Sequence, residues 1–400
     1  MSDINITIDG GTSKRLLTAG KMCDRNIFIT ATGGGGGDIP EEAFNFGGDI
    51  SYTFSQGNWD WFIESYGHRI TTDNITSLFY GFANSRVENI PFTLKAQNIY
   101  GCNLGHAFMG SGLKESPKIR LLTLPEDYLG SPGPCWYAIN LQYLFQNCQQ
   151  LRNADDAFIP ENLEALSYAQ LESEWQDIQL NSMFYNCYSL RTVPKWFYKL
   201  RFHEDTPFIP NIYYMLYSYT FGSCHTLDEV LGLQVISTHG WNNITMENMF
   251  DNTFEYCYRL KNMTFETQED GTPLEARWTN QTLNLAHFVG YSSVASNIVD
   301  YNSGIDYTTR VENDADYSLL KDDPDWWTTD YDYSRYNHDS AVATINSLPD
   351  TSAAIAEVGG TNTIKFKGDS GSSTDGGAIS ALTEEEIAVA AAKGWTVTFE

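Results

Sequence analysis

The sequence repeats one short pattern four times, and this repetition restricts the possible fold more than any other feature of the chain. The pattern is F-x-x-C-x-x-L, and the copies align without gaps. They are Phe145-Gln-Asn-Cys148-Gln-Gln-Leu151, Phe184-Tyr-Asn-Cys187-Tyr-Ser-Leu190, Phe221-Gly-Ser-Cys224-His-Thr-Leu227 and Phe254-Glu-Tyr-Cys257-Tyr-Arg-Leu260. Successive phenylalanines are 39, 37 and 33 residues apart. We therefore expect each copy to mark one structural unit of an array.

Each copy is followed, three residues after its leucine, by another apolar side chain. These residues are Ala154, Val193, Val230 and Met263. They extend the apolar period and predict a helix or turn followed by a short strand. Weaker copies are expected at 107–113 and 287–294, with a further one beginning at Leu78-Phe79. One unit cannot bury its own Phe, Cys and Leu, but stacked units form a continuous core. The pattern predicts an α/β repeat solenoid with long, irregular repeats.

The cysteine of each copy is predicted to be a core residue rather than a metal ligand. A free thiol is a compact, buried hydrophobic group that suits a crowded repeat position. Zinc sites need short local pairs such as C-x-x-C, and the sequence contains none. The chain has seven cysteines, an odd number, so we expect reduced thiols. We predict no metal and no cofactor.

These F-x-x-C-x-x-L units resemble the leucine-rich repeats of bacterial surface proteins of the BspA type. The resemblance covers roughly residues 73–300 and extends to the last unit, Leu382 to Phe399. It implies a leucine-rich-repeat-like solenoid. Repeats in this class usually have about 20–29 residues. The longer units of this chain therefore depart from the family by carrying insertions.

The C-terminal segment 341–400 is predicted to form the last repeat and a cap. Thr383 and Glu386 have the spacing of a capping box, which marks the start of a helix. Ile387, Ala390 and Ala391 make one apolar helix face. Gly394 is expected to end the helix in a left-handed conformation. The residues from Trp395 to Phe399 alternate like a closing strand.

Residues 1–32 are predicted to form a small β module, because apolar and polar residues alternate at 4–8 and again at 27–31. The segment from Gly20 to Ala31 resembles a G-K-x-C-D-x-x-I-x-V-T-A segment of bacteriophage tail and minor structural proteins. This resemblance implies a virion-docking role. The glycines of 33–38 lack the Lys-Ser/Thr ending of a phosphate loop and are expected to form a flexible linker. Residues 39–72 are expected to cap the first repeat.

The segment 301–340 interrupts the repeats with an acidic, aromatic composition. Its ligand or interface candidates are Trp326, Trp327, Tyr331, Tyr333, Tyr336, Asp325 and Asp330. Aromatic rings beside carboxylates suit glycan recognition, but a tucked, partly buried insertion that contacts a neighbouring subunit is the favoured interpretation. The Asp spacing in this segment matches no EF-hand loop, so solvated acidic clusters are favoured over a calcium site.

Charge and missing motifs restrict the possible partners. With 24 Lys and Arg against 51 Asp and Glu, the net charge of −27 disfavours nucleic acid. The N-terminus lacks the pattern of a secretory signal and no stretch of about 20 apolar residues occurs, so membrane insertion is not expected. No nucleophile elbow, H-E-x-x-H or phosphate-loop motif is present. We predict that the protein is not an enzyme.

Together, these features predict a bacteriophage virion protein, made in the host cytoplasm, that forms part of a tail, a fibre or a head-surface appendage. Its solenoid would serve host-surface attachment or subunit assembly. The expected partners are other virion proteins, through the N-terminal module, and a host glycan or protein. Homo-oligomerisation is expected because virion parts are usually symmetric. A bacterial adhesin-like interaction module is the alternative, and a glycan depolymerase is the third hypothesis.

Overall fold

The computed structural model describes most of the repeat region of this 400-residue chain and both of its ends. The described residues are 4–9, 27–32, 44–96, 103–121, 141–158, 180–199, 217–235, 245–257, 260–286, 299–300, 305–306, 336–366 and 382–399.

The described elements are short strands with a few helices. The strands are β1 (Ile4–Asp9), β2 (Ile27–Thr32), β3 (Phe44–Asp49), β4 (Ile70–Ser77), β5 (Leu94–Ala96), β6 (Ile119–Leu121), β7 (Glu229–Leu233), β8 (Asn262–Phe265), β9 (Thr282–Asn284), β10 (Val299–Asp300), β11 (Ile305–Asp306), β12 (Asn362–Phe366) and β13 (Trp395–Phe399). The helices are α1 (Asp60–Tyr66), α7 (His338–Ser347), α8 (Ser352–Val358) and α9 (Glu384–Ala392), and short 3-10 segments cover Ser55–Gly57, Gly67–Arg69 and Phe197–Lys199.

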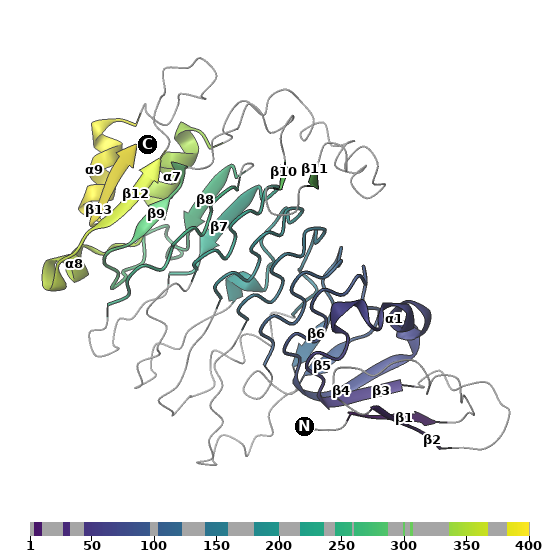
Figure 1. Cartoon of the computed structure of the whole chain (residues 1–400). Coiled ribbons are helices and arrows are strands. Elements are labelled where there is room, and N and C mark those ends of the chain that lie inside the picture. Colours follow the sequence, from purple (N-terminus) through teal and green to yellow (C-terminus); the bar gives the residue numbers. More distant parts are fainter. Residues whose placement is uncertain are drawn as a thin grey trace, which may run out of the picture.

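Most strand pairs are parallel, which is the arrangement expected when each unit contributes one strand. The sheets have the orders β2-β1-β3-β4-β5-β6, β7-β8, β13-β12-β9 and β10-β11. The pairs β1–β3 and β10–β11 are antiparallel, and the other strand pairs of these sheets are parallel. The elements follow chain order along an elongated body, with β1 to β6 at one end and α7 to α9 at the other (Figure 1).

A ladder of backbone hydrogen bonds joins the turns of successive units. The Phe145 N–H donates to the Met183 carbonyl at 2.9 Å, and the Phe184 N–H donates to the Thr220 carbonyl at 3.0 Å. The intervening N–H groups bond within their own turn, as Cys148 does to the Phe145 carbonyl. This alternation gives the buried N–H groups partners without a long helix, so each turn can lie directly on the next. A strand follows the turn in the copies at 221–227 and 254–260, which lead into β7 and β8, whereas the copies at 145–151 and 184–190 are followed only by isolated bridge residues, Asn153 and Thr192.

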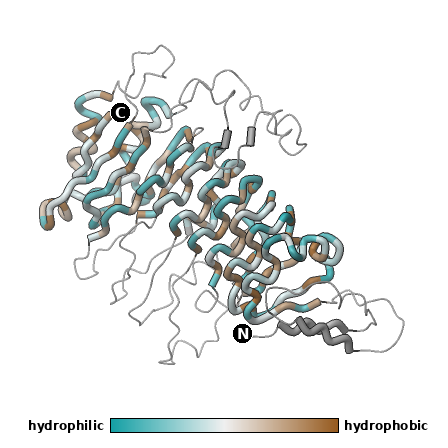
Figure 2. The backbone as a smooth tube through the Cα atoms, viewed as in Figure 1, coloured by the Kyte–Doolittle hydropathy of each residue, from teal (hydrophilic) through white to brown (hydrophobic). Residues whose placement is uncertain are grey.

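A column of phenylalanine rings runs through the core of the array. Neighbouring rings are stacked with interplanar angles of 7° to 22° and centroid distances of 4.8 to 6.0 Å. The members are Phe54, Phe82, Phe108, Phe145, Phe184, Phe221 and Phe254. All twelve Phe, Cys and Leu residues of the F-x-x-C-x-x-L copies are buried. Apolar and polar positions alternate along each coil of the array (Figure 2).

The structure corrects the register of the earliest repeat. The sequence suggested a copy beginning at Leu78-Phe79, but it is the ring of Phe82 that lies in the column, between Phe54 and Phe108. Phe79 instead packs edge-on against Tyr52 and His106. The reason is that the turn aligns Gly81 and Phe82 with the Ala107-Phe108 pair of the next unit, through the Phe82 N–H bond to the Ala107 carbonyl. The predicted copy at 287–294 lies outside the described residues.

At the N-terminal end, β3, α1 and β4 cover the first unit of the array. The side chains of Phe44, Phe46 and Phe62 are buried there, and Phe46 contacts Phe54 of the ring column at 5.1 Å. Strands β1 and β2 pair in parallel, and β1 joins β3 through the Thr7–Asn45 pair. The segments 1–32 and 39–72, which were treated as separate units in the sequence, thus contribute strands to one sheet.

At the C-terminal end, helix α9 and strand β13 close the array. Thr383 and Glu386 form the expected capping box, and Gly394 has a φ of 82° after the helix, so both predictions are confirmed. Ala390 is buried, whereas Ala391 is exposed, so the apolar face is narrower than predicted. The indole N–H of Trp395 donates to the Pro349 carbonyl at 2.9 Å, which ties the start of β13 to the segment between α7 and α8.

Candidate functional site

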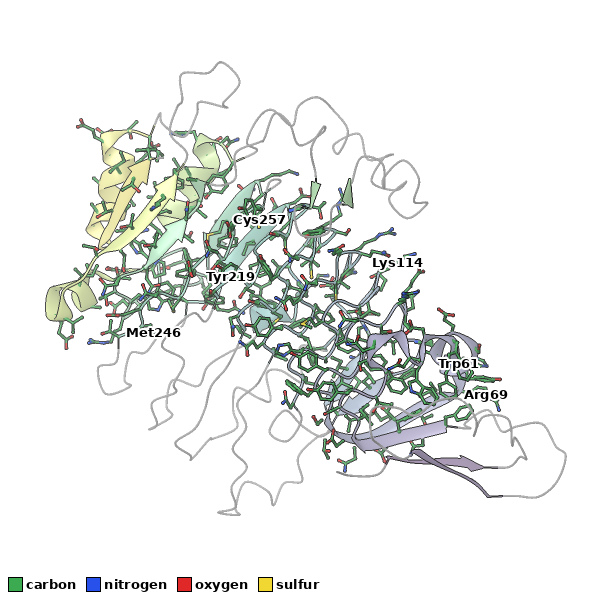
Figure 3. All side chains as sticks on the ribbon, in the orientation of Figure 1. Trp61, Arg69, Lys114, Tyr219, Met246 and Cys257 are labelled. Atoms are coloured by element: carbon green, nitrogen blue, oxygen red, sulfur yellow. The ribbon has the colours of Figure 1, made fainter. Side chains whose placement is uncertain are left out.

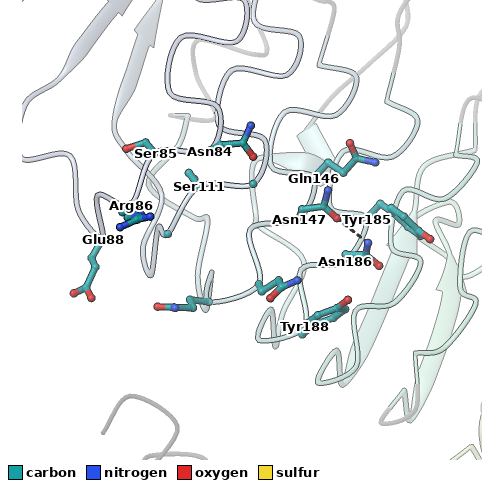
Figure 4. A pocket seen from close by; sticks show the side chains of 14 residues that line it. Asn84, Ser85, Arg86, Glu88, Ser111, Gln146, Asn147, Tyr185, Asn186 and Tyr188 are labelled. Carbon is teal, nitrogen blue, oxygen red and sulfur yellow. Dashed lines mark hydrogen bonds between the residues drawn. The ribbon is translucent and has the colours of Figure 1, made fainter. Parts of the chain in front are cut away.

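A polar groove of about 700 Å³ opens over four consecutive units of the array (Figure 4). Its lining comes from the turns that follow Phe82, Phe108, Phe145 and Phe184. Most of its side chains carry amide or phenol groups. The lining side chains include Asn84, Arg86, Gln146, Asn147, Tyr185 and Tyr188. The volume lies within the range of small-molecule sites, roughly 300–1,000 Å³.

The floor of the groove follows a column of residues with left-handed backbone. Asn84, Gly110, Asn147 and Asn186 have φ values of 55°, 67°, 60° and 61°. Asparagine and glycine tolerate this conformation better than other residues. Each of these residues donates its backbone N–H to a carbonyl of the next unit, for example Asn147 to Tyr185 at 2.8 Å. The side chains of the column are therefore presented at regular intervals from a fixed backbone.

Gly110 differs from the other positions of this column that line the groove, because Asn84, Asn147 and Asn186 carry asparagine. A Cβ atom at Gly110 would lie 2.5 Å from Oδ1 of Asn84. The missing side chain thus leaves room that the Asn84 amide partly occupies. Gly112 is equally constrained, since a Cβ there would lie 3.0 Å from the Arg86 carbonyl oxygen. The two glycines let the units on either side approach closely and keep the middle of the groove open.

The two sides of the groove are held by side-chain hydrogen bonds between units. On one side, the Asp60 carboxylate of α1 accepts from the Ser85 hydroxyl at 2.8 Å and from the Arg86 N–H at 2.9 Å. On the other side, the Asn186 amide donates to Oδ1 of Asn147 at 2.7 Å. Arg86 and Glu88 lie on one side, and Asn147 and Asn186 lie on the other, with Ser111 between them (Figure 4). The groove is therefore shaped before any ligand binds.

Two tyrosine rings at one end of the groove are fixed by aromatic neighbours. Tyr188 stacks on His225 with a centroid distance of 4.5 Å and an interplanar angle of 10°. Tyr185 meets Tyr219 edge-on at 5.3 Å and lies against Gly222, where an added Cβ would be 3.0 Å from its Cδ2. Both tyrosines are partly exposed. They offer ring faces and hydroxyl groups to a ligand in the groove.

A second aromatic row lies on the surface of the first four units. Tyr52, Tyr80, His106 and Tyr143 have φ values of 53° to 58° and contact one another in order at 5.2, 4.4 and 4.4 Å. Burial lowers the pKa of His106, and burial beside the other tyrosines raises the pKa of Tyr80. The row favours a neutral imidazole packed between two phenol rings.

The cysteines of the repeats form a buried column beside the phenylalanine rings. Cys148, Cys187, Cys224 and Cys257 are free thiols, and each donates to the carbonyl oxygen of the phenylalanine one unit earlier, at 3.0 to 3.2 Å. Burial raises the pKa of the Cys148 thiol to about 12 and that of the others as well. A thiol with a raised pKa is a poor nucleophile and a poor metal ligand at neutral pH.

Cys257 lies well inside the array, whereas Trp61 and Arg69 belong to its N-terminal end (Figure 3).

The predicted interface candidates of 301–340 fall mostly outside the described residues. These are Trp326, Trp327, Tyr331, Tyr333, Asp325 and Asp330. Tyr336 is described and is completely buried, with its hydroxyl hydrogen-bonded to Oγ1 of Thr344. Its ring stacks on Phe366 at 6.2 Å. The expectation of a surface role for Tyr336 is therefore wrong, because the start of α7 draws it into the core.

The groove residues were not singled out from the sequence, although one signal for them is present. Asparagine directly precedes the cysteine in two of the four copies, at Asn147 and Asn186. This position requires a left-handed backbone in the structure. A repeated asparagine there was a clue to a row of amides on the surface. Which turns would flank a groove depends on the packing of the units, and the pattern does not contain that information.

In the described part of the chain, no three His, Cys, Asp or Glu side chains come together in a group that could hold a metal ion. None of the described helices is both long enough and apolar enough to cross a membrane. The chain matches no known family model, no curated protein and no solved structure.

Proposed function

We propose that this chain is a bacteriophage virion protein that attaches the particle to the host surface through its repeat array. The observation that carries the proposal is the polar groove, whose amide and phenol groups come from four stacked units and are held in place by hydrogen bonds between those units. A preformed polar site of this kind binds ligands with little cost of ordering its side chains.

The fold assignment that belongs to this proposal is a leucine-rich-repeat-like solenoid. It is supported by the parallel strands, by the ring column and by the backbone ladder that joins each turn to the next. Repeat arrays of this kind present extended surfaces to partners. The acid-rich chain, with a net charge of −27, favours partners without dense negative charge.

The virion part of the proposal is supported by the segment from Gly20 to Ala31, which resembles phage tail and minor structural proteins. In this proposal the first 32 residues or so dock to other virion proteins, and the repeat array is directed to the host. The protein acts as a binding protein and not as an enzyme. Several copies in one particle would add avidity to a weak single site.

The test has two measurements on the full chain. Fluorescently labelled protein is titrated onto cells of candidate hosts, with excess unlabelled protein as competitor. We expect saturable binding that the competitor abolishes. In parallel, purified phage particles are examined by mass spectrometry for peptides of the chain. Saturable binding to host cells together with absence from particles would overturn the virion assignment, and failure to bind any host in which the particles grow would overturn attachment.

A further inference from the structure

We propose that the groove between Arg86 and Tyr188 binds a neutral oligosaccharide. This inference rests on the attachment function proposed above and names the ligand class of one particular surface. It concerns a different site from the acidic, aromatic segment 301–340 that the sequence indicated.

The lining provides the groups that recognise sugars. Side-chain amides of Asn84, Gln146 and Asn147 can both donate to and accept from hydroxyl groups. The rings of Tyr185 and Tyr188 offer apolar faces to the C–H groups of a sugar ring. Neutral amides and phenols in one groove suit a ligand that is rich in hydroxyl groups and has no net charge.

The charges in the lining are few and nearly balanced. Arg86 and Glu88 are the charged side chains among the residues that line the groove. The Glu88 carboxylate accepts from the ammonium group of Lys114 at 2.8 Å, so its charge is compensated. A strongly acidic ligand would meet one arginine against the field of a chain with a charge of −27. This balance favours a neutral glycan over a sialylated, sulfated or phosphorylated one.

Gly110 keeps the middle of the groove open. Its neighbours in the left-handed column are Asn84 and Asn147, so an asparagine at 110 would fit the backbone conformation of the column. It would also displace the Asn84 amide, because even a Cβ there would lie 2.5 Å from Oδ1 of Asn84. Because that oxygen ends a short side chain on the surface, the amide can rotate away without disturbing the core. Gly110→Asn is thus expected to fill the groove and to leave the fold intact.

Gln56 supplies a matched control. It occupies the same column one unit before Asn84, with a φ of 60°, and its N–H donates to the Ala83 carbonyl at 2.7 Å. It is exposed and does not belong to the groove lining. Gln56→Asn therefore places the same new side chain in the same backbone conformation, outside the proposed site.

The experiment uses the full chain on a glycan array that carries neutral oligosaccharides of hexoses and N-acetylhexosamines beside sialylated and sulfated ones. We expect binding to a subset of the neutral glycans. Isothermal titration with the best of them should give an affinity that Gly110→Asn and Tyr188→Ala each weaken at least tenfold. Gln56→Asn should leave the affinity unchanged, and circular dichroism at the temperature of the titration should show that all three variants are folded like the parent protein.

Three outcomes would overturn this inference. They are binding to acidic glycans alone, unchanged affinity in a folded Gly110→Asn variant, and failure to bind any glycan on the array. The host-cell titration separates these results from a failure of the proposed function. If the protein still binds host cells, and only Trp326→Ala/Trp327→Ala abolishes that binding, attachment stands and the groove is not its site. If host cells are not bound either, both proposals fall.

Discussion

The thiol of Cys187 donates a hydrogen bond to the carbonyl oxygen of Phe145 at 3.0 Å, across the boundary between two units of the array. The same bond recurs from Cys148, Cys224 and Cys257 to the phenylalanine one unit earlier. The cysteine is therefore both a small apolar core residue and a donor to a backbone carbonyl of the preceding unit. Ser111 occupies the equivalent position in an earlier unit and is also buried.

The first prediction concerns this hydrogen bond. We expect Cys187→Ala to lower the free energy of unfolding by about 1–3 kcal/mol, because it removes a buried donor and leaves a small cavity. Cys187→Ser should lose less, because the hydroxyl can still donate to the Phe145 carbonyl. Urea unfolding followed by tryptophan fluorescence measures both. Equal stability of the parent protein and the alanine variant would show that the bond contributes nothing.

The second prediction concerns thiol reactivity. Burial raises the pKa of the Cys148 thiol to about 12. Burial also raises the pKa values of the Cys187 and Cys224 thiols well above the usual value for cysteine. At pH 8 these thiols should resist iodoacetamide in the folded protein and react readily in urea, because the thiolate is the reactive form. Mass spectrometry of peptides gives the modified fraction at each site. Rapid labelling of the folded protein at Cys187 would contradict the buried column.

The third prediction concerns the ring column. Phe184 stacks between Phe145 and Phe221 at 5.7 and 6.0 Å and is completely buried. We expect Phe184→Ala to lower the free energy of unfolding by about 3–5 kcal/mol. Phe184→Leu should lower it clearly less, because leucine refills most of the volume of the ring. Chemical denaturation is the measurement. A loss below 1 kcal/mol for the alanine variant would mean that the units do not share a continuous core.

The fourth prediction concerns pH and the contact between α7 and α9. Nε2 of His338 lies 3.1 Å from Oε2 of Glu386, and Asp339 lies on its other side at 3.4 Å. Hydrogen bonds to Glu386 and then to Asp339 raise the pKa of His338 above 6.5. The Thr383 N–H and His338 lower the pKa of Glu386 below 4.5. The stabilising effect of His338 is thus fully present below pH 6.5 and is lost as the pH rises through its folded-state value.

This pH dependence can be measured through the melting temperature between pH 5 and 9. Because the contribution of Glu386 is lost only as the pH falls below 4.5, the pair should contribute most between pH 4.5 and 6.5. His338→Gln should flatten the fall in melting temperature above pH 6.5. Asp339→Asn is the milder control, because Asp339 is almost fully exposed. An identical pH profile in the parent protein and His338→Gln would refute the coupling.

The fifth prediction concerns the left-handed column. Asn186 has a φ of 61°, and its amide donates to Oδ1 of Asn147. We expect Asn186→Ala to lower the free energy of unfolding by about 1–2 kcal/mol, because alanine is strained in this conformation and the hydrogen bond from the side-chain amide is lost. Asn186→Gly loses the same bond but relieves the strain, so it should be the more stable of the two. The reverse order in thermal unfolding would show that backbone strain is unimportant there.

Local patterns in the sequence were sufficient for the repeat core and the C-terminal cap. The buried Phe, Cys and Leu positions could be named from spacing alone, because identical units must bury identical faces. Thr383, Glu386 and Gly394 could be named because helix ends follow rules that involve only a few neighbouring residues. Phe82 was missed because Ser85 and Glu88 stand where its unit should have the cysteine and the leucine of the pattern.

The sequence by itself thus determined that the chain is an array, which residues face its core and how its last helix is capped. Only the tertiary structure decided where polar side chains from different units meet. Asn84, Gly110, Asn147 and Tyr188 belong to four turns that are far apart in the chain, and the ladder of bonds between units brings them to one groove. The same is true of Tyr336, whose polar surroundings in the sequence suggested a surface, while packing against Phe366 buries it. Spacing along the chain predicts whether a residue lies on the buried or the exposed face of its own unit. Contacts between residues of different units depend on how those faces pack, and this is decided only in the tertiary structure.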